Sequence, residues 1–274
     1  MALLPHSAGE DSVNSIPLRN RSPLKFFLLV FTLSLPFWLL GATTELQLLP
    51  GLPVSSIMVV SPLLAASILV YREHKFEGLV RLLTRALDFS RVRAKIWFTP
   101  IILLMPGIML LSYGLMRWMG LPLPVAQFPI LGALVMFLMF FIAAVCEELG
   151  WSGYAIDPMQ DRLGALRAGI LLGLIWASWH VIPLLQADRS AAWISWWCLG
   201  TVAQRVLIVW LYNCTGKSVF TAILFHAMSN ISWQLFPNYG SHYDPRITSL
   251  ITFFVAVTVA LIWGPRTLAR HGNT

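Results

Sequence analysis

Charged residues are scarce in this chain. They make up 11% of its 274 residues, whereas 57% are hydrophobic and the mean hydropathy is +0.72. A soluble domain carries roughly 25% charged residues, and no hydrophilic stretch here is long enough to form a second, soluble domain. The composition therefore excludes a water-soluble fold and predicts an integral membrane protein.

Cysteine is also rare, and its spacing excludes two further classes. Cys146, Cys198 and Cys214 are odd in number and form neither a disulfide framework nor a CxxC metal site. The net charge of +7 comes without a basic stripe interleaved with aromatic residues, so nucleic-acid binding is not indicated. The charges fall in loops between apolar runs, where they set the topology of a membrane protein.

Apolar runs of about 20 residues, the length that crosses a bilayer as a helix, occur eight times. The sequence therefore predicts an all-α, polytopic membrane protein with about eight transmembrane helices in one bundle. The expected spans are Lys25–Thr43, Pro53–Tyr71, Ala94–Met116, Phe128–Cys146, Leu163–Leu185, Ala191–Asn213, Ser218–Phe236 and Thr248–Gly264.

Lysine and arginine are distributed unevenly between the loops of this bundle. Loops and tails on one side carry 15 of them, the other side carries only Arg117, Arg189 and Arg246, and Arg205 falls inside a span. The positive-inside rule places the basic side in the cytosol. We therefore expect both termini in the cytosol, with residues 1–24 as a flexible tail, residues 25–264 as the bundle and residues 265–274 as a C-terminal tail. The short loops favour a bacterial inner (plasma) membrane.

A few polar groups remain inside the predicted spans, where ionisable residues usually mark a functional site. Glu147 and Glu148 close the fourth span, and His180, His226 and Asn230 lie in the fifth and seventh. In isolation, each has a structural reading as a solvated helix end or a hydrogen bond between helices. As a set on three spans, they provide a general base, a group that holds water and donors to an oxyanion. These are the parts needed to hydrolyse an amide without a serine or cysteine nucleophile.

The spacing within the spans sharpens this interpretation. Adjacent glutamates on a helix point about 100° apart, so Glu147 and Glu148 are expected to do different work. His226 and Asn230 are four residues apart and project from one helix face. Trp176 and His180 have the same spacing, which puts an aromatic ring beside that imidazole.

Three motifs occur in order, "EELGWS" at 147–152, "WASWH" at 176–180 and "HAMSN" at 226–230. With them the chain resembles the CPBP family of intramembrane proteases, which includes the type II CAAX prenyl proteases and the bacterial Abi proteins. The resemblance covers roughly residues 128–236. It implies that Glu147 activates water with the help of His180, that His226 and Asn230 form an oxyanion hole, and that Glu148 holds the site together.

The chain departs from the family pattern at one position, because Ser152 stands where the first motif, EExxxR, ends in arginine. Serine cannot neutralise Glu148. Either another cation replaces the arginine, or Glu148 is protonated, or the protein keeps the scaffold without the protease activity. Arg205 is the basic residue deep inside a predicted span, and we hypothesise that it pairs with Glu148.

The sequence thus favours an intramembrane endopeptidase that cleaves a membrane-embedded or lipidated peptide in the bilayer without a cofactor. Three alternatives stay open at this stage. The first is a non-catalytic immunity or scaffold protein, and the second is a proton-coupled transporter, although inverted repeats are not visible. The third is a zinc-dependent version of the same protease with Glu147, His180 and His226 as ligands.

The depths of these residues conflict if every span begins at the membrane surface. Glu147 stands at the end of the predicted fourth span, whereas His180 lies far along the fifth. We expect "EELGWSGY" to continue the fourth helix, the fifth helix to start outside the membrane near residues 162–167, and the site to open to the cytosol.

Overall fold

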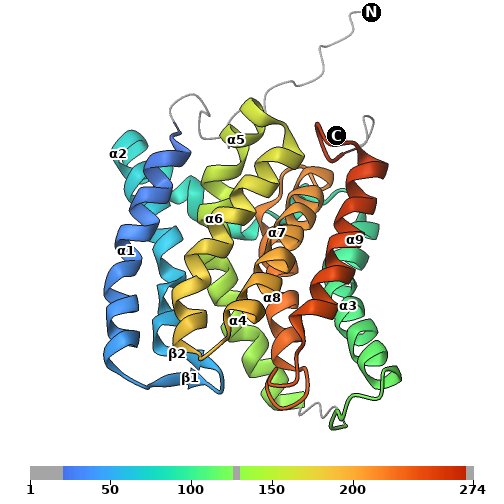
Figure 1. Cartoon of the computed structure of the whole chain (residues 1–274). Coiled ribbons are helices and arrows are strands. Elements are labelled where there is room, and N and C mark those ends of the chain that lie inside the picture. The colour runs from blue at the N-terminus through green and yellow to red at the C-terminus, as the bar shows by residue number, and fades with distance from the viewer. Residues whose placement is uncertain (1–20, 126–129, 270–274) are drawn as a thin grey trace, which may run out of the picture.

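A computed structural model describes residues 21–125 and 130–269, and these residues are almost entirely helical (Figure 1). The long helices are α1 Pro23–Thr43, α2 Ser61–Thr84, α3 Phe98–Trp118, α4 Ile130–Gly150, α6 Ala165–Gln186, α7 Ala191–Cys214 and α9 Pro245–Trp263. Two shorter ones are α5 Ile156–Leu163 and α8 Val219–Gln234. The antiparallel strands β1 Gln47–Leu49 and β2 Leu52–Pro53 form one small hairpin. The predicted all-α bundle is confirmed.

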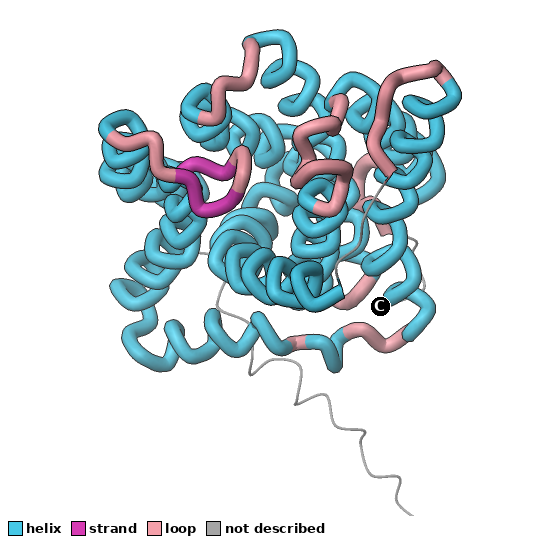
Figure 2. The backbone as a smooth tube through the Cα atoms, turned by 90° about the horizontal axis from the view of Figure 1, so that it is seen from below, coloured by secondary structure: helices cyan, strands magenta, loops and turns pink. Residues whose placement is uncertain are grey.

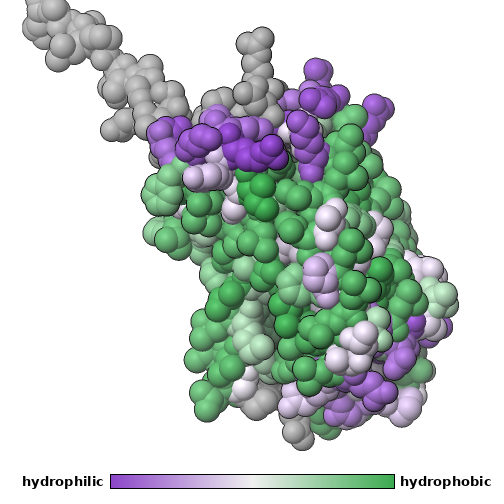
Figure 3. Space-filling model, turned by 90° about the vertical axis from the view of Figure 1, so that its left-hand side faces the viewer, coloured by the Kyte–Doolittle hydropathy of each residue, from purple (hydrophilic) through white to green (hydrophobic). Residues whose placement is uncertain are grey.

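Seven helical segments within the described residues are long and apolar enough to cross a membrane. The seventh predicted span, Ser218–Phe236, corresponds to α8, which has only 16 residues. That is shorter than the roughly 20 residues a straight crossing needs, so α8 extends only part of the way through the bundle. On the face seen in Figure 3, apolar side chains cover most of the middle of the surface, and hydrophilic residues gather toward its two ends. This distribution is that of an integral membrane protein.

The helices lie side by side, so the bundle has two ends (Figure 1). We call one the termini end, because α1 starts there and α9 finishes there, together with the segment 85–97. We call the other the hairpin end, which carries the β1–β2 hairpin, residues 187–190 between α6 and α7, and residues 235–244 between α8 and α9. Seen from below, the hairpin stands at this second end (Figure 2). The described parts of the predicted tails, residues 21–24 and 265–269, lie at the termini end, whereas residues 1–20 and 270–274 lie outside the described residues.

The described part of the predicted C-terminal tail is packed against the bundle. The backbone carbonyls of Pro265 and Arg266 accept hydrogen bonds from the amides of Leu166 and Ala165, respectively. Leu268 is fully buried. These contacts satisfy amides in the first turn of α6 that have no partner inside the helix.

The predicted fourth span does not end at Cys146. Helix α4 continues through the two glutamates into a π-helical turn, Trp151–Ala155, and then into α5, giving one continuous helical segment of 34 residues. A π-turn widens the helix by one residue and often occurs at functional sites. The backbone oxygen of Gly153 in this turn accepts hydrogen bonds from the guanidinium groups of Arg21 and Arg85, at 3.2 and 2.9 Å. Glu147 therefore lies in the interior of a long helix.

Gly164 joins this segment to α6 with a φ of 77°, a left-handed conformation that glycine adopts without strain. Glu147 precedes Gly164 by 17 residues and His180 follows it by 16. The two arms of this helical hairpin are thus nearly equal, and they bring both residues to one depth. The conflict of depths disappears because the fourth helix continues past Cys146, as the sequence "EELGWSGY" led us to expect. The predicted fifth span, Leu163–Leu185, agrees with α6 to within two residues.

Helix α8 reaches the same depth because it begins inside the bundle. Its N-terminus packs near the π-turn, where Val219 approaches Gly153. Asp88 caps it from another segment, accepting hydrogen bonds from the Ser218 hydroxyl and from the amides of Val219 and Phe220 at 2.8, 3.2 and 3.0 Å. A carboxylate at this position also complements the positive end of the helix dipole. His226 consequently stands two turns into α8, level with the glutamates.

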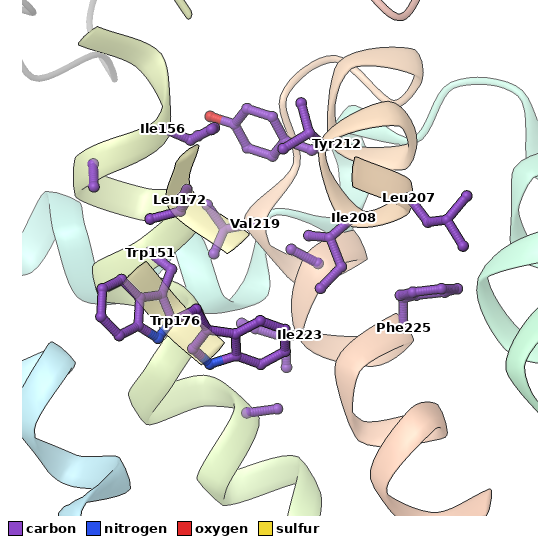
Figure 4. Packing of buried hydrophobic residues seen from close by; sticks show 14 of the residues in the cluster. Trp151, Ile156, Leu172, Trp176, Leu207, Ile208, Tyr212, Val219, Ile223 and Phe225 are labelled. Atoms are coloured by element: carbon purple, nitrogen blue, oxygen red, sulfur yellow. The ribbon is translucent and has the colours of Figure 1, made fainter. Parts of the chain in front are cut away.

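The core around this level is built from large aromatic side chains. Trp151 and Trp179 are completely buried, and their rings meet edge to face at 5.6 Å. Trp151 and Trp176 lie next to each other, with both indole nitrogens turned to the same side (Figure 4). Such rings have few side-chain torsions to fix, so they form a rigid wall behind the polar groups.

Candidate functional site

Glu147 and Glu148 point in different directions from α4, as their adjacency predicts. Both side chains are buried, Glu148 completely. Among the described residues, the two glutamates form hydrogen bonds with different side chains. The His226 ring lies between them, with Nδ1 near Glu148 and Nε2 near Glu147. The two carboxylates thus occupy separate environments.

Glu148 is the centre of a fully buried polar cluster. Arg205 donates to both of its oxygens, with Nη1–Oε2 and Nη2–Oε1 distances of 2.8 and 2.9 Å. Ser152 donates its hydroxyl hydrogen to Oε2, and Nδ1 of His226 lies 3.0 Å from Oε1. A carboxylate that receives this many donors, including a bidentate guanidinium, is well compensated for its burial.

The hypothesised pairing of Arg205 with Glu148 is therefore present in the structure. The cation comes from α7 rather than from the helix that carries the glutamates, and Ser152 contributes a neutral hydrogen bond at the motif position. Gly173 makes this possible, because a Cβ atom there would lie 2.9 Å from the Val202 Cα atom and 3.2 Å from the Arg205 Cβ atom. Helices α6 and α7 can thus approach closely where Arg205 enters the core.

Glu147 is held from one side by two indole rings. Trp176 donates to Oε2 at 2.7 Å and Trp151 donates to the same oxygen at 3.3 Å. The other oxygen, Oε1, lies 4.0 Å from Nε2 of His226. The two indole hydrogen bonds fix the rotamer of Glu147. Because Glu147 lines the internal cavity, Oε1 is left for a molecule in that cavity.

The hydrogen bonds of the two histidines identify which ring nitrogen faces the cavity. His180 Nδ1 lies 2.9 Å from the carbonyl oxygen of Trp176, which only accepts, so Nδ1 carries the hydrogen. Nε2 of His180 is then the atom with a free lone pair when the ring is neutral. His226 uses Nδ1 toward Glu148, which likewise leaves Nε2 for other partners. Both rings line the cavity.

Asn230 lines the same cavity one helical turn beyond His226, as the spacing predicts. The neighbouring Ser229 donates to Gln204 Oε1 of α7 at 3.0 Å. This contact joins α8 to the helix that supplies Arg205. The five residues predicted for catalysis, Glu147, Glu148, His180, His226 and Asn230, are therefore brought together, with Trp176, Ser152 and Arg205 around them.

The cavity has a volume of about 470 Å³ and extends from Glu147 toward the hairpin end. Leu48, Gly51 and Arg189 line its outer part, which we call the mouth. The basic loops stand at the other end of the bundle, so the cavity extends away from the basic side to which the sequence led us to expect it to open. The reason is that the packed π-turn lies on the side of the glutamates that faces the termini end. The cavity beside Glu147 and α8 therefore extends toward the hairpin end.

The cavity also reaches the outer surface of α4. Met139 and Ile142 line it and are 45% and 65% exposed, on a face that is apolar and belongs to a spanning helix. We call this opening the lipid rim. Trp193 and Trp197 line the opposite side, and the Trp197 ring stands 5.4 Å from that of His180. The cavity thus connects a hydrocarbon-facing side with a water-facing end.

The zinc alternative receives no geometric support from these contacts. Within residues 21–125 and 130–269, no group of three His, Cys, Asp or Glu side chains is arranged to hold a metal ion.

Sequence reasoning missed two features of the site. Trp151 donates to Glu147, and its position four residues along the helix is the signal that could have revealed it. The π-turn had no such signal, because it depends on contacts that Arg21 and Arg85 make from distant segments. The other residues of the site had already been singled out in the sequence, by their polarity or by their place in a motif.

Fold and site together define a polytopic membrane protein with a buried glutamate–histidine centre beside an internal cavity. Comparison with known proteins gives two matches. Residues 129–232 match the family of type II CAAX prenyl endopeptidases, Rce1-like. The chain is also 28% identical over 268 residues to CAAX prenyl protease 2 of Methanococcus maripaludis, covering 88% of this chain and 93% of that protein. The predicted resemblance to the type II CAAX prenyl proteases is confirmed, and that family is one of membrane endopeptidases.

Proposed function

We propose that this protein is an intramembrane glutamate-type endopeptidase. The observation that carries the proposal is that two acceptor atoms and two donor side chains line one cavity. Oε1 of Glu147 and Nε2 of His180 are the acceptors, and the side chains of His226 and Asn230 are the donors. Such a set performs hydrolysis by an activated water.

The first step is orientation and activation of that water. A water molecule has two hydrogens, and Glu147 Oε1 and His180 Nε2 accept one each. The water oxygen then directs a lone pair at the carbonyl carbon of the scissile peptide bond. As the C–O bond forms, one hydrogen passes to Glu147, and the carbonyl oxygen gains negative charge.

His226 and Asn230 stabilise this oxyanion. The Asn230 amide donates directly, and His226 donates from Nε2 as an imidazolium whose Nδ1–H is held by Glu148. Fixed donors in a site shielded from water cost little reorganisation when the charge develops. Glu148 and Arg205 do not touch the substrate in this mechanism. They fix the orientation of His226 and so act as positioning residues.

Collapse of the tetrahedral intermediate completes the reaction. Glu147 returns its proton to the nitrogen of the leaving amine as the C–N bond breaks. The products are a carboxylic acid and an amine, and the glutamate is regenerated as a carboxylate. No covalent enzyme intermediate is formed.

The walls of the cavity favour a membrane-associated substrate. The lipid rim at Met139 and Ile142 gives access from the bilayer, and most of the lining is apolar. The relative in Methanococcus maripaludis is a CAAX prenyl protease by name, which supports a membrane-embedded or lipidated peptide. The lysine and arginine distribution supports cytosolic termini, and the short loops favour a bacterial plasma membrane.

Purified protein in liposomes, incubated with a library of acylated peptides, tests the proposal. Glu147→Gln keeps the shape of the side chain but removes the base, and we expect cleavage to fall by about 10²- to 10⁴-fold. Glu77→Gln is the matched control, because that glutamate is exposed and pairs only with Arg81 on its own helix. Cleavage that persists in Glu147→Gln, or that chelation abolishes and zinc restores, would contradict the mechanism.

A non-catalytic immunity or scaffold function is the second candidate. The observation that favours it is Ser152 at the motif position of arginine, since a rearranged support is compatible with a site no longer used for chemistry. It predicts that Glu147→Gln retains the biological activity of the protein in cells, and that no peptide in the library is cleaved.

A further inference from the structure

Arg85 is a cation at the termini end of the bundle that the proposed mechanism does not use. It follows α2 directly and begins the short 3₁₀ turn Arg85–Leu87. Its side chain is only 13% exposed, and it does not line the cavity. A guanidinium taken out of water needs partners for its N–H donors, so those partners show which parts of the molecule it holds together.

The hydrogen bonds of Arg85 reach three separate parts of the chain. Nη1 donates to the carbonyl oxygen of Gly153 in the π-turn at 2.9 Å. Nη2 donates to the hydroxyl of Tyr212 in α7 and to the carbonyl oxygen of Lys217 just before α8, both at 2.9 Å. One rigid, planar group thus fixes the distances between three segments.

Each of these three segments carries part of the candidate site. The π-turn follows the two glutamates on one continuous helix, α7 carries Arg205, and α8 carries His226. Tyr212 is seven residues after Arg205, so the two side chains lie two turns apart on one face of α7. Arg85 therefore joins, at the end of the bundle, the same segments whose side chains meet at Glu148 in its interior.

The π-turn itself carries donors to both glutamates. Trp151 donates to Glu147, Ser152 donates to Glu148, and Gly153 is the next residue. A π-turn holds one residue more than the α-helical turn it replaces. If it relaxed to an α-helix, the helix on one side of it would rotate by about 100° relative to the other side.

The α5 side of the π-turn is anchored separately. Asp157 in α5 accepts a hydrogen bond from Tyr212 at 3.1 Å and lies 3.0 Å from the ammonium group of Lys217. Because α5 is fixed in this way, a relaxed π-turn would rotate the α4 side, which carries the glutamates. Two guanidinium groups oppose that rotation at the Gly153 carbonyl, and Arg85 makes the shorter bond, at 2.9 Å against 3.2 Å for Arg21.

We propose that Arg85 is a positioning residue for the catalytic centre. By holding the π-turn against α7 and the start of α8, it fixes the orientation of Glu147 and Glu148 relative to His226. This inference rests on the proposed function, and it adds to it a residue outside the cavity on which the geometry of the reacting groups depends. Arg85 touches neither the substrate nor the water in this mechanism.

The first experiment follows this geometry without turnover. Protein containing 5-fluorotryptophan is placed in lipid nanodiscs, and the fluorine resonance of Trp151 is assigned by its loss in Trp151→Phe. We expect Arg85→Gln to shift or broaden that resonance, and Arg85→Lys, which can still donate to Gly153, to change it less. Arg81→Gln is the matched control and should leave the resonance in place, because that arginine pairs with Glu77 on its own helix.

The second experiment separates positioning from general stabilisation. Both kcat and KM are measured for one cleaved peptide, well below the melting temperature of each variant. We expect Arg85→Gln to lower kcat by about 10- to 100-fold, as small displacements of reacting groups do, with KM within about twofold of the starting value. A merely structural role predicts a lower melting temperature with an unchanged kcat for the folded fraction.

A double-mutant cycle shows whether Arg85 acts through the π-turn. Once the Trp151 donor is displaced by Arg85→Gln, removing it with Trp151→Phe should cost little more, so the two losses in kcat should not be additive. Arg81→Gln combined with Trp151→Phe is the control, and it should show only the loss of Trp151→Phe. If Arg85→Gln does not fold, Arg85→Lys takes its place in both experiments, since one ammonium group cannot reach all three acceptors.

The outcomes separate this proposal from the catalytic one. A Trp151 resonance that stays unchanged in the Arg85 variants overturns the positioning role even if Glu147-dependent cleavage is found. Additive losses in the cycle, or an unchanged kcat, overturn it as well. If no peptide is cleaved by the unmodified protein, the proposed function fails, while the fluorine resonance still decides whether Arg85 sets the geometry beside the glutamates.

Discussion

Arg205 and Glu148 form a bidentate ion pair between α7 and α4, with both side chains completely buried. The pair joins two helices that the sequence separates by 57 positions, and its carboxylate also orients the catalytic candidate His226. It provides from a neighbouring helix the charge that the family motif places one turn after Glu148. The activity and the stability of the site should therefore depend on this exchange of the motif arginine for Arg205.

Arg205→Gln should therefore lower both activity and stability. Breaking one side of a buried pair leaves an uncompensated carboxylate, and we expect a loss of about 3 to 5 kcal/mol in the free energy of unfolding. The melting temperature in detergent and the cleavage rate are the two measurements. Placing arginine back at the motif position, in the double variant Ser152→Arg with Arg205→Gln, should recover part of both. A double variant that is no better than Arg205→Gln would contradict the exchange.

Trp176→Phe should reduce catalysis with a small change in stability. Phenylalanine keeps the ring in the core but removes the indole N–H, which donates to Glu147 at 2.7 Å. We expect kcat to fall about tenfold, because the carboxylate loses its shorter fixed hydrogen bond. Trp151→Phe is the comparison, and its longer 3.3 Å contact should make the loss smaller. The order of the two kcat values checks the assignment, and equal values would argue against it.

Asn230→Ala should lower kcat without raising KM. A donor that stabilises only the oxyanion contributes little before the reaction begins, and loss of one such donor costs about 10²- to 10³-fold in rate. Steady-state kinetics on one cleaved peptide gives both constants. Ser229→Ala is a nearby control on the same helix, since that hydroxyl contacts Gln204 rather than the reacting atoms. A rise in KM with unchanged kcat would show that Asn230 binds substrate instead.

Asp88→Ala should loosen the start of α8. The carboxylate accepts three hydrogen bonds at that helix end, and a methyl group accepts none of them. We expect a destabilisation of about 1 to 2 kcal/mol, typical of a lost N-cap, together with reduced activity because His226 is on the same helix. Thermal unfolding and cleavage are measured in parallel. Unchanged values for both would mean that Ser218 alone caps α8.

The orientation of the bundle is open to a direct test by cysteine labelling. Ser241→Cys at the hairpin end and Asp161→Cys at the termini end place a thiol on either exposed end, in a chain whose three cysteines are first replaced by alanine. Positive-inside topology predicts that an impermeant maleimide labels Ser241→Cys in intact cells and Asp161→Cys only after lysis. The mouth beside Arg189 would then face away from the cytosol. The reverse pattern would place the mouth on the cytosolic side.

The sequence was a good guide where a single helix or a single polar group carried the information. Eight apolar runs and the isolated polar residues within them predicted the bundle and nearly all side chains around Glu148. Helix ends were harder to predict, because the apolar sequence near Cys146 continues past the glutamates into the π-turn. The direction of the cavity was mispredicted for a different reason. It depends on how α8 and the β1–β2 hairpin pack at the far end, and no local pattern encodes that.

The equal arms on either side of Gly164 have a mechanical consequence. Glu147 and His180 belong to one helical hairpin, so a tilt or vertical shift of that hairpin carries both by the same amount. The water between them would keep its two acceptors in a thinner or thicker bilayer, while the His226 donor on α8 would shift relative to them. Membrane thickness should therefore act on this protein through the stabilisation of the oxyanion rather than through the activation of the water.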